Sequence, residues 1–140
     1  MAEVTFIDHI GIAVRDLDEA SSTFAGILGV SESRRERVES EGVEIAVFET
    51  GGARIELLSP LHEQSPVAKF LEKRGPGIHH ISLGSRDIRG RYAELSRLGF
   101  TFPGGIRKGG ERREIFFLSP KETQGVLIEY TSPSERGSND

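Results

Sequence analysis

The feature that most constrains the fold of this chain is an internal repeat. The segment that starts at Asp8-His9-Ile10 begins again at His79-His80-Ile81, an offset of 71 residues. Further matches follow at nearly the same offset: RDL at 15–17 with RDI at 86–88, LGV at 28–30 with LGF at 98–100, and IELLSP at 55–60 with IEYTSP at 128–133. Self-similarity at a nearly constant spacing is typical of a duplicated structural module. The sequence therefore predicts two copies of one module.

Each half has the pattern of a strand, a helix and a run of further strands. Period-2 alternation of β-branched residues predicts a first strand at 4–14, and Asp16 with Glu19 predicts the start of a helix that ends at Gly29. Asp87 begins the matching helix of the second half. The other predicted elements are a charged strand or loop at 31–41, a hairpin of 43–49 and 53–58, a linker helix from Ser65-Pro66 to Gly75-Pro76, a flexible glycine-rich loop at 103–110, and strands at 114–118 and 126–131. The expected fold is α+β, with two tandem βαβββ modules that close a cupped mixed sheet.

Length, charge and the termini limit the organisation of the chain and its partners. We expect modules at 1–60 and 77–133, a linker at 61–76 and a disordered tail at 134–140, all within the single domain that 140 residues suit. A net charge of −4 and a pI near 5.6 argue against a nucleic-acid or anionic-membrane surface, so small molecules are the expected partners. The N-terminus has no basic segment followed by a long apolar run, which favours a cytoplasmic protein.

Two of the predicted strands have one small, polar face. Each carries a histidine followed at alternate positions by small residues: His9 with Gly11 and Ala13, and His80 with Ser82 and Gly84. We infer a cavity above this face and helices on the apolar side. The chain has no cysteine, so a metal ion in such a cavity would be held by imidazole and carboxylate groups.

Two histidines and two glutamates recur at equivalent places in the repeat. His9 and His80 lie near the start of the halves, and Glu56 and Glu129 lie near the end. We hypothesise that these four side chains hold one divalent metal ion and leave coordination positions open, as catalytic sites do. Taken singly, a strand histidine is more often a core or surface side chain, and a glutamate after isoleucine is more often exposed. Shared ancestry of the halves explains part of the recurrence.

Three blocks of the chain resemble the methylmalonyl-CoA epimerases, which belong with glyoxalase I to the vicinal-oxygen-chelate superfamily. The blocks are DHIGIAV, IELLSPL followed by SPVAKFLEKRGPGIHHISL, and IFFLSPKETQGVLIEY. The resemblance spans roughly residues 4–131 and implies the paired βαβββ fold, a homodimer, and a metal at the positions of His9, Glu56, His80 and Glu129. Co²⁺ is the expected ion, with Ni²⁺, Mn²⁺, Zn²⁺ or Mg²⁺ as alternatives. Some epimerases carry Gln where Glu56 stands, and Ser119 stands where relatives often have His.

The reaction that the resemblance implies is the interconversion of (2R)- and (2S)-methylmalonyl-CoA, a step of propionate metabolism. The α-proton is removed while a metal ion stabilises the enolate, and inversion needs acid/base groups on both faces of the carbon. We predict Glu44 as one of them, because alternation places it opposite Val43 and Ile45 and hence towards the cavity, and Glu129 as the other. An exposed strand glutamate explains Glu44 equally well. The CoA phosphates need positive charge, and the candidate cations, which lie near one another in the sequence, are Arg107, Lys108, Arg112 and Lys121. A solvated surface role is the simpler interpretation of each.

Other functions are compatible with the same residues. A glyoxalase I type lactoylglutathione lyase uses the same ligand set on a glutathione hemithioacetal, and only the block from IELLSPL to GIHHI favours the epimerase over it. A metal-free binding module of the same fold needs no His/Glu quartet. An extradiol dioxygenase needs two histidines and one carboxylate, one ligand fewer than this chain offers. The remaining histidines, His62 and His79, have no counterpart in the other half and are interpreted as non-ligands.

Overall fold

The computed structural model of the chain describes residues 5–133 and contains eight strands and three α-helices. The strands are β1 (Phe6–Ala13), β2 (Arg34–Val38), β3 (Val43–Phe48), β4 (Arg54–Pro60), β5 (Gly77–Gly84), β6 (Arg107–Lys108), β7 (Glu114–Leu118) and β8 (Ile128–Thr131); the helices are α1 (Leu17–Leu28), α2 (Pro66–Arg74) and α3 (Ile88–Arg97). The strand order is β2-β3-β4-β1 in the first half and β5-β8-β7-β6 in the second, with parallel and antiparallel pairs in each. The predicted α+β class and the βαβββ order, which occurs twice along the chain, are confirmed.

The described chain divides into two units. One consists of residues 9–79, and the other consists of residues 5–8 together with 80–133. The start of β1 therefore belongs with the second half of the repeat. The module boundaries predicted at 1–60, 61–76 and 77–133 stay a prediction, and the predicted tail at 134–140 lies outside the described residues.

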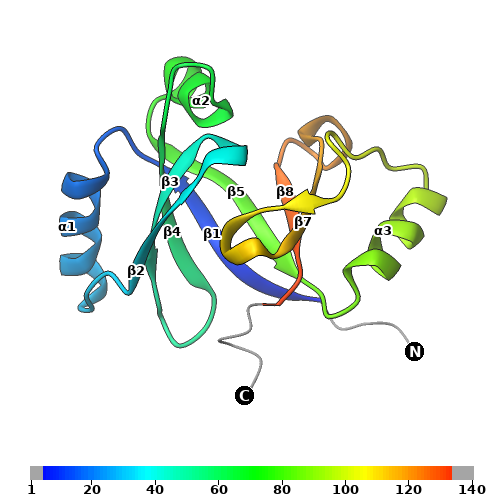
Figure 1. Ribbon diagram of the computed structural model, residues 1–140, viewed down its shortest axis with the longest axis horizontal. Coiled ribbons are helices and arrows are strands. Elements are labelled where there is room, and N and C mark those ends of the chain that lie inside the picture. The colour runs from blue at the N-terminus through cyan, green and yellow to red at the C-terminus, as the bar shows by residue number, and fades with distance from the viewer. Residues whose placement is uncertain (1–4, 134–140) are drawn as a thin grey trace. The chain divides into compact units, whose positions relative to one another are not determined.

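The unit of residues 9–79 has an apolar core on each face of its strands. β1 pairs in parallel with β4, and β3 pairs antiparallel with β4 and β2 (Figure 1). α1 covers one face, where Ala46, Phe48 and Leu57 are buried. α2 contributes Val67 and Leu71 to the core of the opposite face, which also contains Val43, Ile45, Val47 and Leu58. Glu56 of β4 lies on this second face, because it is two residues before Leu58 along the strand.

The unit of residues 5–8 and 80–133 repeats the strand pairing of the first unit. β5 pairs in parallel with β8, and β7 pairs antiparallel with β8 and with the short strand β6. α3 packs Ile88 and Leu95 against Phe116 and Tyr130, whose rings stack at a centroid distance of 5.2 Å. Helix α3 thus occupies one face of these strands, and the alternate residues of β5, β7 and β8 face the other side.

The helix ends follow the sequence pattern. Asp16 caps α1 by accepting a hydrogen bond from the Glu19 amide at 3.0 Å, and Gly29 ends the helix in the left-handed conformation at φ 73°. Asp87 and Ser65 cap α3 and α2 in the same way. None of the helices within residues 5–133 combines the length and apolar character that a membrane span requires.

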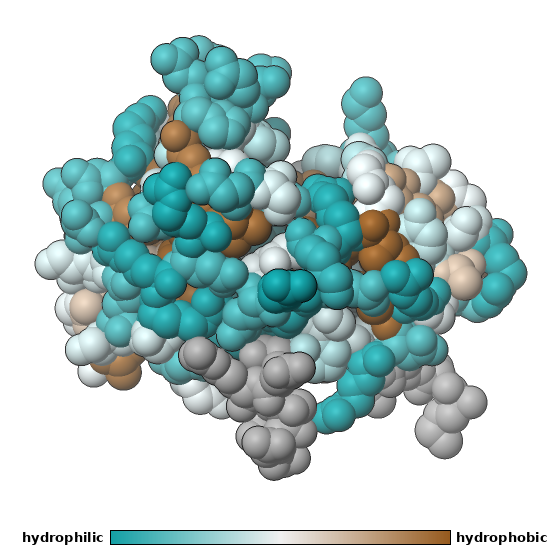
Figure 2. All heavy atoms as spheres, viewed as in Figure 1, coloured by the Kyte–Doolittle hydropathy of each residue, from teal (hydrophilic) through white to brown (hydrophobic). Residues whose placement is uncertain are grey.

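The structure refines two predicted segments. The glycine-rich segment at 103–110 was expected to be a flexible loop, but Arg107 and Lys108 pair with Ile115 and Glu114 to form β6, so that expectation is wrong for these two residues. The charged segment at 31–41 contains the edge strand β2 and a 3₁₀ turn. Its Arg and Glu side chains make the surface around β2 mainly hydrophilic (Figure 2), which disfavours pairing of this edge with another chain.

Candidate metal centre

Each unit contains one buried histidine beside one buried glutamate. In both units the glutamate lies opposite a small residue of the neighbouring parallel strand, and the histidine is two residues before that small residue. Glu56 has Gly11 as its partner on β1, two residues after His9. Glu129 has Ser82 as its partner on β5, two residues after His80. The repeat therefore extends from the sequence to the strand register, and a small residue beside each glutamate leaves room for the histidine to approach it diagonally.

The pair of the first unit joins β1 to β4. The Nε2 atom of His9 lies 3.4 Å from Oε1 of Glu56, and both residues are buried, with exposures of 4% and 5%. Val47 is the partner of Glu56 on β3, so the carboxylate has an apolar neighbour on that side. A carboxylate is rarely buried to this extent unless it is paired or coordinates a metal.

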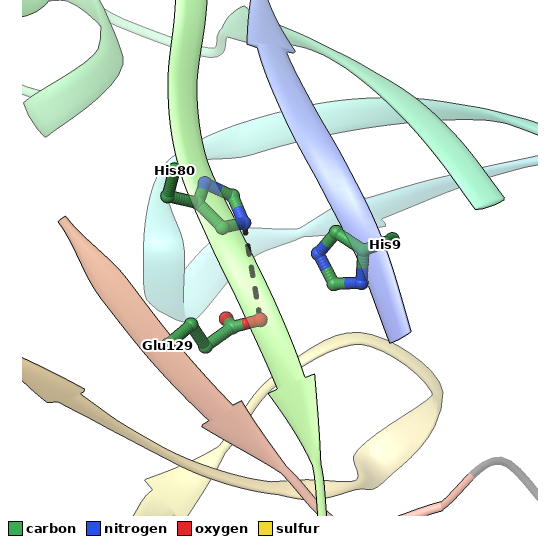
Figure 3. Close-up of side chains that lie close together, drawn as sticks. All are labelled: His9, His80 and Glu129. Carbon is green, nitrogen blue, oxygen red and sulfur yellow. Dashed lines mark ion pairs between the residues drawn. The ribbon is translucent and has the colours of Figure 1, made fainter. Parts of the chain in front are cut away.

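The pair of the second unit joins β5 to β8. The Nε2 atom of His80 lies 3.8 Å from Oε1 of Glu129, and both side chains are buried (Figure 3, dashed line). The ring of Phe117, the partner of Glu129 on β7, packs edge-on against the His80 imidazole at a centroid distance of 6.2 Å. Phe117 is thus an apolar neighbour of both members of this pair.

The spacing within both pairs suits a shared cation. Two ligand atoms bound to one ion at about 2.0–2.2 Å lie roughly 3–3.6 Å apart at tetrahedral or octahedral angles. A charge-assisted hydrogen bond would instead bring nitrogen and oxygen to about 2.7–2.9 Å. The 3.4 Å separation lies within the first range, the 3.8 Å separation lies slightly above it, and both lie outside the second. Both pairs belong to groups of residues that could hold a metal ion, and their nitrogen and oxygen donors suit a first-row divalent cation.

Glu44 does not share the face of Glu56. On β3, Glu44 lies opposite Ser59, whereas Val47 lies opposite Glu56, and the two faces alternate. Arg35 of β2, on the same face as Glu44, reaches Asp18 of α1 at 2.7 Å, which identifies this face as the one that α1 covers. The orientation expected for Glu44 is therefore wrong, because alternation fixes which residues share a face but does not say which face carries the site.

A further carboxylate, not predicted from the sequence, lies on the face of Glu56. Glu36 of β2 is the partner of Ile45, so it lies on the Glu56 side of the strands, half-buried and 2.9 Å from Arg34. The charge density of this segment suggested a solvated strand. The alternation of RRERV against VEIAVF could have revealed this placement, because it puts Arg34 and Glu36 on the apolar face of β3.

The remaining predicted residues lie in separate places. Arg107 stacks on the Phe117 ring at 5.2 Å, while Lys108, Arg112 and Lys121 are exposed. His79 packs edge-on against Phe70 at 5.1 Å, and burial lowers the pKa of His79. Neither His79 nor His62 belongs to the candidate metal groups among residues 5–133.

Comparisons with known proteins agree with this fold. Residues 8–117 match the family described as the glyoxalase/bleomycin resistance protein/dioxygenase superfamily. The Bacillus subtilis protein YqjC, which has no assigned function, is 40% identical over 91% of each chain. The human mitochondrial methylmalonyl-CoA epimerase is 32% identical, over 88% of this chain and 71% of its own. A Streptomyces coelicolor methylmalonyl-CoA epimerase, solved with 2-nitronate-propionyl-CoA, is 34% identical over 94% of this chain and 96% of its own, with a TM-score of 0.87.

The duplicated modules and the matched family model define the class. The chain belongs to the glyoxalase/bleomycin resistance protein/dioxygenase superfamily. Within it, the chain is a member of the methylmalonyl-CoA epimerase family.

Proposed function

We propose that this protein is a metal-dependent epimerase that interconverts (2R)- and (2S)-methylmalonyl-CoA. One observation carries the proposal: a buried His–Glu pair recurs in each half at an identical strand register, in a chain of the epimerase family. The Streptomyces relative, solved with an acyl-CoA analogue, supports an acyl-CoA substrate for this chain. The same family membership disfavours the lactoylglutathione lyase and the metal-free binding module.

In this proposal His9, Glu56, His80 and Glu129 together hold one divalent ion, with Co²⁺ expected and Ni²⁺, Mn²⁺, Zn²⁺ or Mg²⁺ as alternatives. When bound, the ion supplies a Lewis acid for the negative charge that develops on the thioester oxygen. The apolar neighbours of the pairs, Val47 and Phe117, would exclude water around that charge and so strengthen its stabilisation. Loss of the α-proton is otherwise too slow for a carboxylate base.

Further parts of the proposal concern the substrate tail and the assembly. The Arg107 guanidinium of the second unit lies over the Phe117 ring. Among the predicted cations, Arg107 is the best placed to bind a CoA phosphate. The expected assembly is a homodimer. A cytoplasmic location and a role in propionate metabolism complete the proposal.

The function is tested by assaying two substrates side by side. We expect the Co²⁺-loaded protein to epimerise methylmalonyl-CoA at C2. It should leave the hemithioacetal of methylglyoxal and glutathione unchanged. Chiral analysis of the acyl-CoA and absorbance of the thioester product measure the two reactions. Turnover of the hemithioacetal without epimerisation would favour the lyase, and no turnover of either substrate with any of the five ions would favour a binding module.

Proton transfer in this reaction requires an acid/base group on each face of the α-carbon. We propose Glu129 for one face, as the sequence predicts, and a glutamate of the β2–β3 hairpin for the other. Glu44 is the candidate from the sequence, and Glu36 is the candidate that the strand register favours, because it shares the face of Glu56. Arg34 holds Glu36 in place at 2.9 Å.

The variants Glu36→Gln and Glu44→Gln separate these candidates. Solvent deuterium exchange of the α-proton should fall about 100-fold in E36Q, the lower range for loss of a general acid/base, and should be unchanged in E44Q. Both substitutions preserve shape and remove one charge, so each is the control for the other. The opposite pattern would return the role to Glu44, and unchanged exchange in both variants would remove this hairpin from the mechanism.

A further inference from the structure

Ser82 has a buried hydroxyl for which the described structure offers no hydrogen-bond partner. The side chain is fully buried, at 0% exposure, and lies in the middle of β5. Its Oγ atom makes no hydrogen bond to any described residue. Leaving a buried donor unsatisfied is unfavourable in a folded protein, so a serine at such a position calls for a partner that forms in another state.

The register points to Glu129 as that partner. Ser82 and Glu129 are directly opposed on the parallel strands β5 and β8, so their side chains rise from the same face of the sheet. On the other side, Glu129 is opposed by Phe117 of β7, which has no donor. Of the two residues that flank Glu129 across the strands, only Ser82 can donate a hydrogen bond to its carboxylate.

The first half of the repeat supplies an internal comparison. There the residue opposite the glutamate is Gly11, which has no side chain, and the His–Glu spacing is nevertheless 3.4 Å. A hydroxyl at this register is therefore not needed to bring the imidazole and the carboxylate together. Ser82 places a possible donor opposite one of the two glutamates, so the strand neighbours of the two carboxylates differ chemically.

We propose that Ser82 is a positioning residue that donates a hydrogen bond to Glu129 when Glu129 binds the metal ion. The inference rests on the proposed metal site. A carboxylate ligand has two oxygens, and the hydrogen bond to one of them fixes the plane of the group and so the direction of the other. Partners of this kind change metal affinity by about 10- to 100-fold when they are removed. Glu56, opposite Gly11, has no such aid, so Glu129 is the better fixed of the two ligands.

The test measures the affinity of Ser82→Ala for Co²⁺ by competition with a chromophoric chelator, and its Tm with and without Co²⁺. We expect affinity to fall about 10- to 100-fold. Without metal the Tm should stay equal or rise, because the substitution removes an unsatisfied hydroxyl. Ser82→Gly, which reproduces the residue of the first half, should also lose affinity. The control Ser59→Ala changes a buried serine on the α1-covered face of β4 and should keep the affinity of the natural protein.

The outcomes separate this proposal from the proposed function. If S82A and S82G bind Co²⁺ as tightly as the natural protein, Ser82 has no role toward the metal, while the metal site stands. A Tm that falls equally with and without Co²⁺, at unchanged affinity, assigns the hydroxyl to folding alone and overturns the proposal in the same way. If the natural protein binds none of the five candidate ions, the proposed function and this inference both fail.

Discussion

Replacing His80 by Ala should lower the rate of methylmalonyl-CoA epimerisation at least about 1,000-fold. His80 is one of the four proposed ligands, and its imidazole lies 3.8 Å from the Glu129 carboxylate. A Lewis acid at a developing enolate supplies several kcal/mol, and each 1.36 kcal/mol corresponds to a tenfold change in rate. Because the proposed ion is shared by both halves, His9→Ala should have an effect of the same size. The rates are measured by chiral analysis at saturating Co²⁺.

His79→Ala is the matched control for this prediction. His79 is adjacent to His80 on β5 but packs edge-on against Phe70, and burial lowers its pKa. The variant should keep the metal and a rate within about threefold of the natural protein. An equal loss of activity in H79A and H80A would mean that damage to β5, and not loss of a ligand, explains the effect.

Replacing Arg113 by Met should lower the free energy of unfolding by about 3–5 kcal/mol. The Arg113 guanidinium lies 3.1 Å from Asp8, and both side chains are buried, at 8% and 6% exposure. It also donates to the carbonyl of Ser132 at 3.3 Å. Removing one partner of a buried pair leaves an uncompensated charge, which is the cause of the large effect. Equilibrium urea unfolding measures the loss, and the double variant that also changes Asp8 to Leu should recover part of it.

Arg89→Met provides the comparison for an exposed pair. Arg89 binds Glu114 at the surface and lowers the pKa of that carboxyl through this hydrogen bond. Exposed ion pairs contribute little, so the loss should stay below about 1 kcal/mol. Similar losses in R113M and R89M would show that burial of the Asp8 pair has no consequence for stability.

The sequence predicted those features of the fold that depend on local chemistry or on the repeat. Asp16, Ser65 and Asp87 cap their helices as expected, because a cap depends on residues within one turn. The βαβββ order followed from periodicity in the first half, and the repeat extended it to the second half. The two-residue strand at Arg107 and Lys108 was not predicted. It forms only through pairing with β7, and the glycine-rich sequence around it has no strand pattern of its own.

The sequence named four candidate residues, but it predicted only part of their arrangement. The repeat indicated His9, Glu56, His80 and Glu129, and the structure pairs the histidine and glutamate of each half. Whether they act as ligands stays a prediction. The orientation of Glu44 could not be obtained from alternation, because a period of two leaves the choice of face open until the partner strands are known.

The pairing of Ser82 with Glu129 could not be predicted from the sequence either. Strand pairing sets the two residues opposite each other across β5 and β8, and only the folded structure shows that the hydroxyl is buried without a partner. Neither fact has a local signal in GIHHISLG.

In the proposed site the two halves hold a single ion between them, and the number of ions per chain tests this most directly. After loading with Co²⁺ and removal of excess metal, elemental analysis should find one Co²⁺ per chain in the natural protein. It should find almost none in either His9→Ala or His80→Ala. Two ions per chain in the natural protein, with each variant losing only one of them, would contradict the shared site.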